Sequence, residues 1–148
     1  MFYLQRKIEK FRLETKNLID MEIAVTKGMK VSVIAEFQPF YSDPERNHFA
    51  FSYRIRIENH SDATMKLLKR HWYIWDSIGQ SSEVIGDGVV GYQPVIEPGS
   101  YHEYVSGCNF KSGIGKMYGF YTMERVLDGK TFLIVIPEFI MTVPYMLN

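Results

Sequence analysis

One stretch decides the fold: Phe49-Ala-Phe51-Ser-Tyr53-Arg-Ile55-Arg-Ile57-Glu58. Large apolar residues occupy every second position, and mostly polar residues stand between them. Successive side chains of a β-strand point to opposite faces of a sheet. This alternation therefore predicts a strand with one face in the core and the other face in solvent.

Similar strand patterns recur after residue 21, and turn-forming residues separate them. Further strands are expected over residues 31–37, 63–78, 101–109, 117–125 and 131–143. Turns are expected at Asn59–Asp62, Asp76–Gly79 and Glu97–Ser100, and Asp128-Gly129 predicts a two-residue hairpin loop. Pro137 lies inside the last strand pattern, which indicates an edge strand or a β-bulge. Seven or so short strands, with no helix after residue 20, predict an all-β fold, namely an antiparallel β-sandwich.

The composition limits the classes of function. The chain has 148 residues, which suits a single domain with a real core. Its 17 Lys and Arg residues balance 17 Asp and Glu residues, so it lacks the excess of positive charge that nucleic-acid binding requires. No run approaches the roughly 20 apolar residues needed to cross a membrane. We therefore expect no nucleic-acid partner and no membrane insertion.

Cysteine and histidine usage bears on location and cofactors. The single cysteine, Cys108, excludes an intramolecular disulfide and a cysteine-based zinc site. A secreted sandwich of this size often carries a disulfide, so we expect a cytoplasmic protein. Four histidines are scattered without metal-ligand spacing (His48, His60, His71 and His102). No metal and no cofactor are expected.

Residues 1–20 differ from the rest of the chain. Apolar residues lie near one helical face (Leu4, Ile8, Phe11 and Leu18), and five basic residues minus three acidic ones give this segment a charge of +2. We expect a short helical or disordered N-terminal extension over residues 1–20 and a β-sandwich domain over residues 21–148. Met21 is an alternative start, and docking of the extension to a membrane surface or a partner is a further alternative.

A glycine-rich segment carries the pattern G-x-G-x-x-G at Gly86, Gly88 and Gly91. A dinucleotide-binding motif needs a helix directly after the glycines, so that the pyrophosphate rests on its N-terminus. Here Gly91 is followed by Tyr-Gln-Pro94, which is turn chemistry. The pattern therefore does not predict a dinucleotide-binding fold.

Two interpretations of the glycine segment remain. Successive N–H groups in such a loop can cradle a phosphate or a pyrophosphate. No basic residue stands between residues 80 and 111, however, so a phosphate would lack a charged partner nearby in the sequence. This favours the second interpretation, a glycine-rich crossover or bulge between two sheets at which Val89 and Val90 fill the core.

Arg70-His71-Trp72 is the other dense cluster. Arg70 could bind an anion or a carboxylate of a partner, and His71 could take part in acid–base chemistry. Alternatively, Trp72 is a buried core tryptophan and Arg70 has a structural role. No Ser/His/Asp or Cys/His spacing proposes a residue that would orient His71 as a catalytic base. The sequence therefore predicts no enzymatic activity.

These motifs resemble the ApaG family. The resemblance rests on Gly28-x-x-Val31-x-Val33, Phe51-x-Tyr53-Arg-Ile55-x-Ile57-x-Asn59, Leu67-Leu68-x-Arg70-His71-Trp72, Gly86-x-Gly88-Val-Val-Gly91-x-Gln93-Pro94, Gly115-x-Met117-x-Gly119 and Ile136-Pro137-x-Phe139. It spans about residues 22–148. Two features depart from the family pattern: residues 1–20 precede the usual start, and Ser112-Gly113 stands where members commonly have Thr-Pro.

The resemblance carries expectations about fold and function. It implies an immunoglobulin-like or fibronectin-III-like β-sandwich. It also implies a link to cobalt and magnesium efflux or resistance in bacteria. The same domain occurs in eukaryotic F-box proteins and in a polymerase-interacting protein, which implies protein–protein contact. The family has no agreed enzymatic activity, and its glycine motif is regarded as a candidate pyrophosphate site.

Three classes of function follow. The favoured one is a non-catalytic module that binds a protein partner, with an indirect role in Co²⁺ and Mg²⁺ homeostasis. The alternative is a binder of a phosphorylated small molecule, pyrophosphate or nucleotide, through Gly86–Gly91. A hydrolase or an efflux carrier is the weakest. The candidate ligand or partner residues are Arg70, His71, Gly86, Gly88 and Gly91, and a homo-oligomer is also compatible with the sequence.

Overall fold

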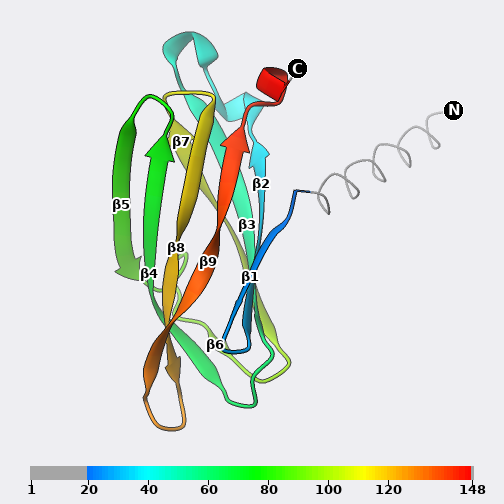
Figure 1. Cartoon of the computed structure of the whole chain (residues 1–148), viewed down its shortest axis with the longest axis vertical. Helices are drawn as coiled ribbons and strands as arrows, with labels where there is room; N and C mark the ends of the chain where they lie inside the picture. Colours follow the sequence, from blue (N-terminus) through cyan, green and yellow to red (C-terminus); the bar gives the residue numbers. More distant parts are fainter. Residues whose placement is uncertain (1–19, 148) are drawn as a thin grey trace, which may run out of the picture.

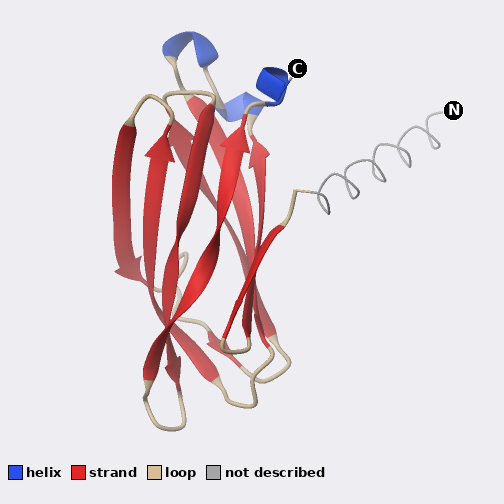
Figure 2. Ribbon diagram, in the orientation of Figure 1, coloured by secondary structure: helices blue, strands red, loops and turns tan. Residues whose placement is uncertain are grey.

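The computed structural model describes residues 20–147, which form two antiparallel β-sheets packed face to face (Figures 1 and 2). The first sheet has the strand order β1-β2-β3-β7. The second has the order β5-β4-β8-β9, and the short strand β6 also pairs with β4. The prediction of an all-β antiparallel sandwich is confirmed. The expected N-terminal extension lies, apart from Asp20, outside the described residues.

The described residues contain nine strands, where seven or so were expected. They are β1 (Glu22–Thr26), β2 (Met29–Phe37), β3 (Phe49–Asn59), β4 (Met65–Asp76), β5 (Gln80–Asp87), β6 (Val95–Ile96), β7 (Tyr101–Phe110), β8 (Ile114–Arg125) and β9 (Thr131–Thr142). Three short 3-10 helices cover Pro39–Tyr41, Pro44–Arg46 and Pro144–Leu147. Within residues 20–147 no helix is long and apolar enough to cross a membrane.

Strand β3 contains the alternating stretch from which the fold was predicted. It lies between β2 and β7, with Ile55 opposite Val33 on one side and opposite Tyr104 on the other. Its apolar side chains, among them Ile55 and Ile57, are buried between the sheets. An interior strand with one covered face yields the period of two that the sequence shows.

The core between the sheets is centred on aromatic side chains. Trp72 on β4 is only 3% exposed. Its ring centroid lies 5.7 Å from that of Tyr53, 6.0 Å from Phe139 and 6.4 Å from Tyr121, all edge-to-face. This geometry is the favourable one for aromatic pairs. The structural interpretation of Trp72 as the core tryptophan is therefore correct.

Strand β4 contains a β-bulge at Leu68. Its register with β8 shifts by one residue between Leu67 and Lys69. One extra residue reverses the direction in which every later side chain points. Leu67 is buried in the core, and after the bulge Arg70 and Trp72 lie on this inner face, whereas His71 lies on the outer face.

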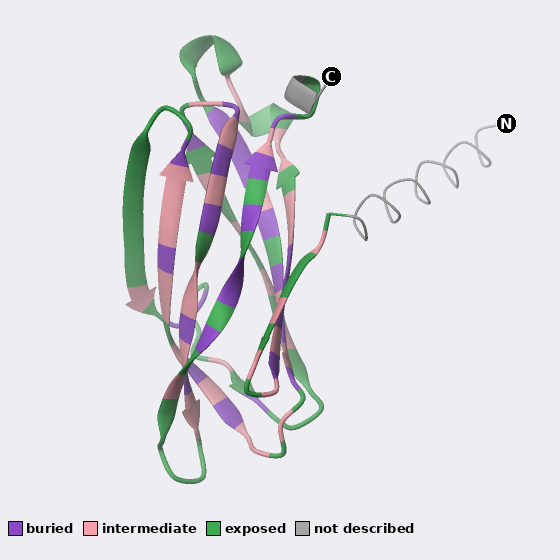
Figure 3. Ribbon diagram, viewed as in Figure 1, coloured by how far each residue is buried: buried purple, intermediate pink, exposed green. Residues whose placement is uncertain are grey.

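The two edges of the second sheet differ. Strand β9 is an edge strand, and its register with β8 shifts around Pro137, so both the edge and the bulge predicted there are confirmed. Strand β1 lies alongside, because the Thr26 hydroxyl accepts a 3.1 Å hydrogen bond from the Val135 N–H. At the other edge, β5 is exposed along almost its whole length (Figure 3).

Most of the expected turns are present. Gly79 N–H donates to the Asp76 carbonyl at 2.9 Å, and this turn joins β4 to β5. The prediction of a two-residue hairpin loop at Asp128-Gly129 is wrong. The loop spans four residues, Val126–Gly129, because the Arg125 N–H pairs with the Lys130 carbonyl and the Arg125 guanidinium binds the Asp128 carboxylate at 2.6 Å.

Candidate functional site

The glycine motif forms an excursion beside the bulge of β4. Strands β5 and β6 both pair with β4, and residues 88–94 connect them. The segment therefore stays within one sheet, and the expectation of a crossover between two sheets is wrong. The Leu68 carbonyl at the bulge accepts hydrogen bonds from the Gly88 N–H at 2.8 Å and from the Gln93 side-chain amide at 3.0 Å. The bulge and the glycine segment therefore hold each other in place.

Val90 and Gly91 form the tip of this excursion. Both have positive φ, 47° and 79°, and the flanking residues Val89 and Tyr92 exchange backbone hydrogen bonds of 2.7 and 3.0 Å. This is the arrangement of a two-residue hairpin turn. Val89 is buried but Val90 is exposed, so only one of the two valines expected in the core lies there. The N–H groups of Gly88, Val89 and Tyr92 are all used within the protein.

Arg70 lies on the inner face of β4, against Gly86. Its Nη1 donates to the carbonyl oxygens of Asp87 at 2.9 Å and Gly88 at 3.0 Å. A Cβ atom at Gly86 would lie 2.9 Å from Nη2 of Arg70, so glycine leaves room for the guanidinium. The charged group near the glycine motif thus binds carbonyl oxygens of the loop, and an anion would have to compete with them.

The sheet separates Arg70 from His71. His71 lies on the outer face, where its Nε2 is 2.8 Å from the Glu83 carboxylate on β5. Its ring stacks on Tyr73 at 4.6 Å and packs against Phe120 at 4.8 Å. The two residues that the sequence placed in one cluster therefore cannot act on one ligand from the same side of the sheet.

A group of rings covers the outer surface of β4 and β8, and we call it the aromatic face. It consists of His71, Tyr73 and Trp75 on β4 and of Tyr118 and Phe120 on β8. Tyr73 and Tyr118 stack with their centroids 5.2 Å apart. The Lys116 ammonium lies 5.7 Å from the Trp75 ring and 5.9 Å from the Tyr118 ring, and it pairs with Glu138 at 3.5 Å.

A pocket of about 480 Å³ opens on the aromatic face. Tyr73, Trp75 and Tyr118 supply its apolar wall, and Ser81 and Glu83 of β5 belong to its polar wall. Lys116 also lines the pocket, where it pairs with Glu138. The Glu83 side chain is 57% exposed, and that of His71 is 20% exposed. The pocket therefore combines aromatic surface with an accessible carboxylate, a combination that suits a partly cationic or amphipathic ligand.

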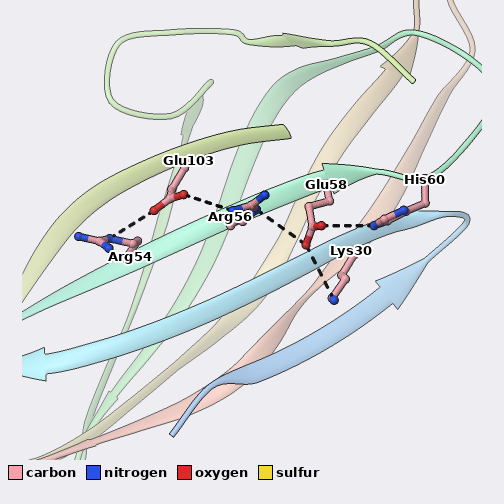
Figure 4. A network of polar contacts seen from close by, with 6 residues as sticks. All are labelled: Lys30, Arg54, Arg56, Glu58, His60 and Glu103. Atoms are coloured by element: carbon pink, nitrogen blue, oxygen red, sulfur yellow. Dashed lines mark ion pairs between the residues drawn. The ribbon is translucent and has the colours of Figure 1, made fainter. Parts of the chain in front are cut away.

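The outer surface of the other sheet has a different character. Its charged side chains form a chain of ion pairs, Arg54–Glu103 at 3.4 Å, Arg56–Glu103 at 3.9 Å, Arg56–Glu58 at 4.0 Å, Lys30–Glu58 at 3.9 Å and His60–Glu58 at 3.4 Å (Figure 4). Such pairs are typical of a solvated surface, where each contributes little to stability. One face of the sandwich is thus charged and the opposite face is aromatic.

Sequence reasoning missed the aromatic face. The signal was present, because Tyr73-x-Trp75 and Tyr118-x-Phe120 alternate with the period of a strand. Glu83 was missed because β5 was not expected to be a strand.

The interior also holds titratable groups. The hydroxyls of Tyr104 and Tyr121 are hydrogen-bonded to each other between the sheets, and burial raises the pKa of both. Burial raises the pKa of the Cys108 thiol to about 12. Within residues 20–147, no group of three or more His, Cys, Asp or Glu side chains lies together in a way that could hold a metal ion.

These features define a class of protein: a two-sheet antiparallel β-sandwich with a glycine-rich excursion beside its central strand. The model of the ApaG domain matches residues 39–125. The Protein ApaG of Anaeromyxobacter dehalogenans (strain 2CP-C) is 46% identical over 128 residues, which are 86% of this chain and 100% of the relative. That of Sinorhizobium fredii (strain NBRC 101917 / NGR234) is 41% identical over 121 residues, 82% of this chain and 92% of the relative. The chain belongs to the ApaG family.

A solved structure agrees with this assignment. It is a crystal structure described as that of an ApaA protein from Bordetella pertussis, with a TM-score of 0.76 and 38% sequence identity. The match covers 78% of this chain and 94% of the Bordetella chain. The family resemblance expected from the sequence is therefore confirmed.

Proposed function

We propose that this protein is a non-catalytic binding module that holds a protein partner on its aromatic face. The observation that carries the proposal is the group of partly exposed rings around the pocket, in which Tyr118 is 39% exposed. Aromatic residues are enriched in the centres of protein interfaces, because they bury a large area with few rotatable bonds. The opposite sheet carries ion pairs on its outer surface, and in this proposal that surface stays in contact with solvent.

His71 has a carboxylate partner, Glu83, that could orient it as a catalytic base and that the sequence did not propose. The proposal gives His71 no catalytic role, because no nucleophile is hydrogen-bonded to it among the described residues. In the described part of the chain, its polar contact is the Glu83 carboxylate, and two rings pack against its own ring. A nucleophile activated by His71 would need a hydroxyl or thiol within hydrogen-bond reach of it. The proposal therefore includes no turnover.

The family resemblance and the cysteine usage suggest the cellular role and the location of the proposed module. Its role in Co²⁺ and Mg²⁺ homeostasis would be indirect, through the partner that it binds, and its location would be the cytoplasm. The alternative, phosphate binding at Gly86–Gly91, is less well supported, because the N–H groups of Gly88, Val89 and Tyr92 already have acceptors within the protein.

Partner capture from native cytosol by two tyrosine variants, with and without Mg²⁺, tests the proposal. Tyr118→Ala removes a ring of the aromatic face, and Tyr101→Ala removes an exposed tyrosine that lies under Arg56 on the other sheet. We expect Tyr118→Ala to lower capture at least about tenfold, as for an interface hot spot. Tyr101→Ala should leave capture unchanged, and circular dichroism should show both variants folded.

Two results would contradict the proposal. One is equal capture by the wild type and Tyr118→Ala. The other is hydrolysis of nucleotides or phosphate esters by the purified protein that is lost in His71→Ala. Binding of pyrophosphate at micromolar affinity in calorimetry, unaffected by Tyr118→Ala, would favour the glycine segment as the functional site instead.

A further inference from the structure

Strand β5 is an open edge that borders the pocket. It pairs with β4 on one side, and among residues 20–147 no strand pairs with its other side. Seven of its eight residues are exposed (Figure 3). Natural edge strands are usually blocked by lysine, proline or a bulge. The sequence Gln80-Ser-Ser-Glu-Val-Ile-Gly-Asp87 has neither lysine nor proline, and its register with β4 is unbroken.

Strand β9, at the far edge of the same sheet, shows what a blocked edge looks like here. It carries Pro137 within a shift of register, and the Val135 N–H is already bound by Thr26 of β1. Of the two edges of this sheet, β5 is therefore the one that has no proline, no bulge and no neighbouring strand in the described part of the chain.

The direction of the backbone groups on β5 follows from its register. In an antiparallel pair, the N–H and C=O groups of alternate residues point to the partner strand. Gly88 donates its N–H to Leu68 of β4, in register with the ladder that runs from Lys69–Asp87 to Asp76–Gln80. Counting back in twos, the backbone groups of Glu83 and Ile85 point away from β4, toward the open edge.

We propose that β5 accepts an extended basic segment of a partner protein as an additional strand. In this mode, main-chain hydrogen bonds supply affinity, and alternate side chains of the added strand reach a neighbouring pocket. Here that pocket is bounded by β5 itself, through Ser81 and Glu83. The inference rests on the proposed function and deepens it, because it names the kind of partner and how it binds.

The charges of this edge select a basic partner. Both charged side chains of strand β5, Glu83 and Asp87, are acidic. Two cations nearby are already bound, Arg70 by the carbonyls of Asp87 and Gly88 and Lys116 by Glu138. Lys69 on β4 stands opposite Asp87, so the 57% exposed Glu83 is the carboxylate that a partner would meet. The rings beside it already attract one ammonium group, since Lys116 lies over Trp75 and Tyr118. A second copy of this chain fits less well, because β5 against β5 would bring the carboxylates of two Glu83 and two Asp87 residues together and add no basic residue from either strand.

A defined peptide tests the inference on the full-length chain. The probe is the blocked hexapeptide Lys-Val-Lys-Val-Lys-Val, titrated into ¹⁵N-labelled protein. We expect its binding to shift the amide signals of β5 and of the aromatic face, and to weaken as salt is added. The matched controls are Glu-Val-Glu-Val-Glu-Val and a Lys-Val peptide N-methylated at alternate residues, which keeps the side chains but cannot pair as a strand on that side.

A pair of variants isolates the backbone of β5. Ile85→Pro removes an N–H that points to the open edge and spares the pairing with β4, and Ile85→Ala removes the exposed side chain alone. We expect Ile85→Pro to raise the Kd of the Lys-Val peptide at least about tenfold and Ile85→Ala to raise it less than about threefold. If Ile85→Pro fails to fold, the N-methylated peptide decides the same question on the wild-type chain.

Several outcomes would overturn the inference: no binding of the Lys-Val peptide, equal binding of the N-methylated or the Glu-Val peptide, or a dimer of the free chain that Ile85→Pro abolishes. Capture of the native partner separates this failure from that of the proposed function. If Tyr118→Ala loses the partner and Ile85→Pro keeps it, strand addition is wrong and the aromatic face stands. If neither variant loses the partner, both proposals are wrong.

Discussion

Gly88 and Tyr92 lie so close together that a Cβ atom on Gly88 would overlap the carbonyl oxygen of Tyr92. Gly91, three residues further along the same loop, also has positive φ, but a Cβ atom there would have no neighbour within 4 Å. The two glycines therefore separate two physical requirements, a left-handed backbone at both positions and a close approach at Gly88 alone.

Alanine at each position should measure these requirements separately. Gly91→Ala should lower the free energy of unfolding by about 1 kcal/mol, the usual cost of a left-handed non-glycine residue. Gly88→Ala should cost clearly more, because the Tyr92 carbonyl must move and its hydrogen bond with the Val89 N–H at 2.7 Å must lengthen. Urea denaturation gives both values, and equal losses would contradict the geometry.

Arg70 should stabilise the fold by binding the backbone at the end of β5. Arg70→Ala leaves the carbonyls of Asp87 and Gly88 without their donor, so we expect a loss of about 1–3 kcal/mol in the free energy of unfolding. Arg54→Ala is the control, because Arg54 is 62% exposed and its ion pair with Glu103 lies on the solvated face. Thermal unfolding that shows the two variants equally stable would contradict a stabilising role of Arg70.

Cys108 should be unreactive in the folded protein. Burial raises its pKa to about 12, and the thiolate is the form that reacts with disulfide reagents. At pH 8 we expect the folded chain to react at least about a hundredfold more slowly than the chain in denaturant. Thiol titration with an aromatic disulfide checks this, and comparable rates would mean that the thiol is open to solvent.

His102 should make stability depend on pH. Burial lowers its pKa in the folded state, while the unfolded chain binds the proton near pH 6.5. The unfolded state therefore binds more protons below this pH, and stability should fall as the pH drops below about 6.5 toward the folded-state pKa. His102→Gln should reduce the difference in stability between pH 7.5 and pH 5, measured by urea denaturation. An unchanged difference would assign the pH dependence to other groups.

The alternation of apolar and polar residues predicted those strands that have one face in the core. Strand β3 and the buried Trp72 were correctly predicted, because an interior strand with one covered face must alternate apolar and polar residues. Strand β5 was not predicted. It stands at a sheet edge, where both of its faces meet solvent. Because neither face is buried, Gln80–Asp87 need not alternate apolar and polar residues, and the pattern that marks a strand is missing.

The candidate site was predicted only in part. The glycines were correctly expected to form a bend, and the structure shows that Gly88 is needed for a close approach and Gly86 for the packing of Arg70. The opposite orientations of Arg70 and His71 follow from the alternation of any strand that contains both. The bulge could not be predicted, because the contacts of its Leu68 carbonyl with Gly88 and Gln93 join residues far apart in the sequence. Whether any of these residues binds a partner or a ligand stays a prediction.

The bulge at Leu68 also constrains how this chain can change in length during evolution. Loss of that one codon would restore a regular ladder between β4 and β8 with Trp72 still in the core and His71 still on the outer face, but it would remove the carbonyl that binds the Gly88 N–H and the Gln93 amide. The loop at Val126–Gly129 lies outside the ladder, so a codon gained there would leave every strand pair unchanged. Relatives that lack the bulge residue should therefore keep the sandwich but hold the glycine segment differently, whereas changes of length at the tip between β8 and β9 should leave both unchanged.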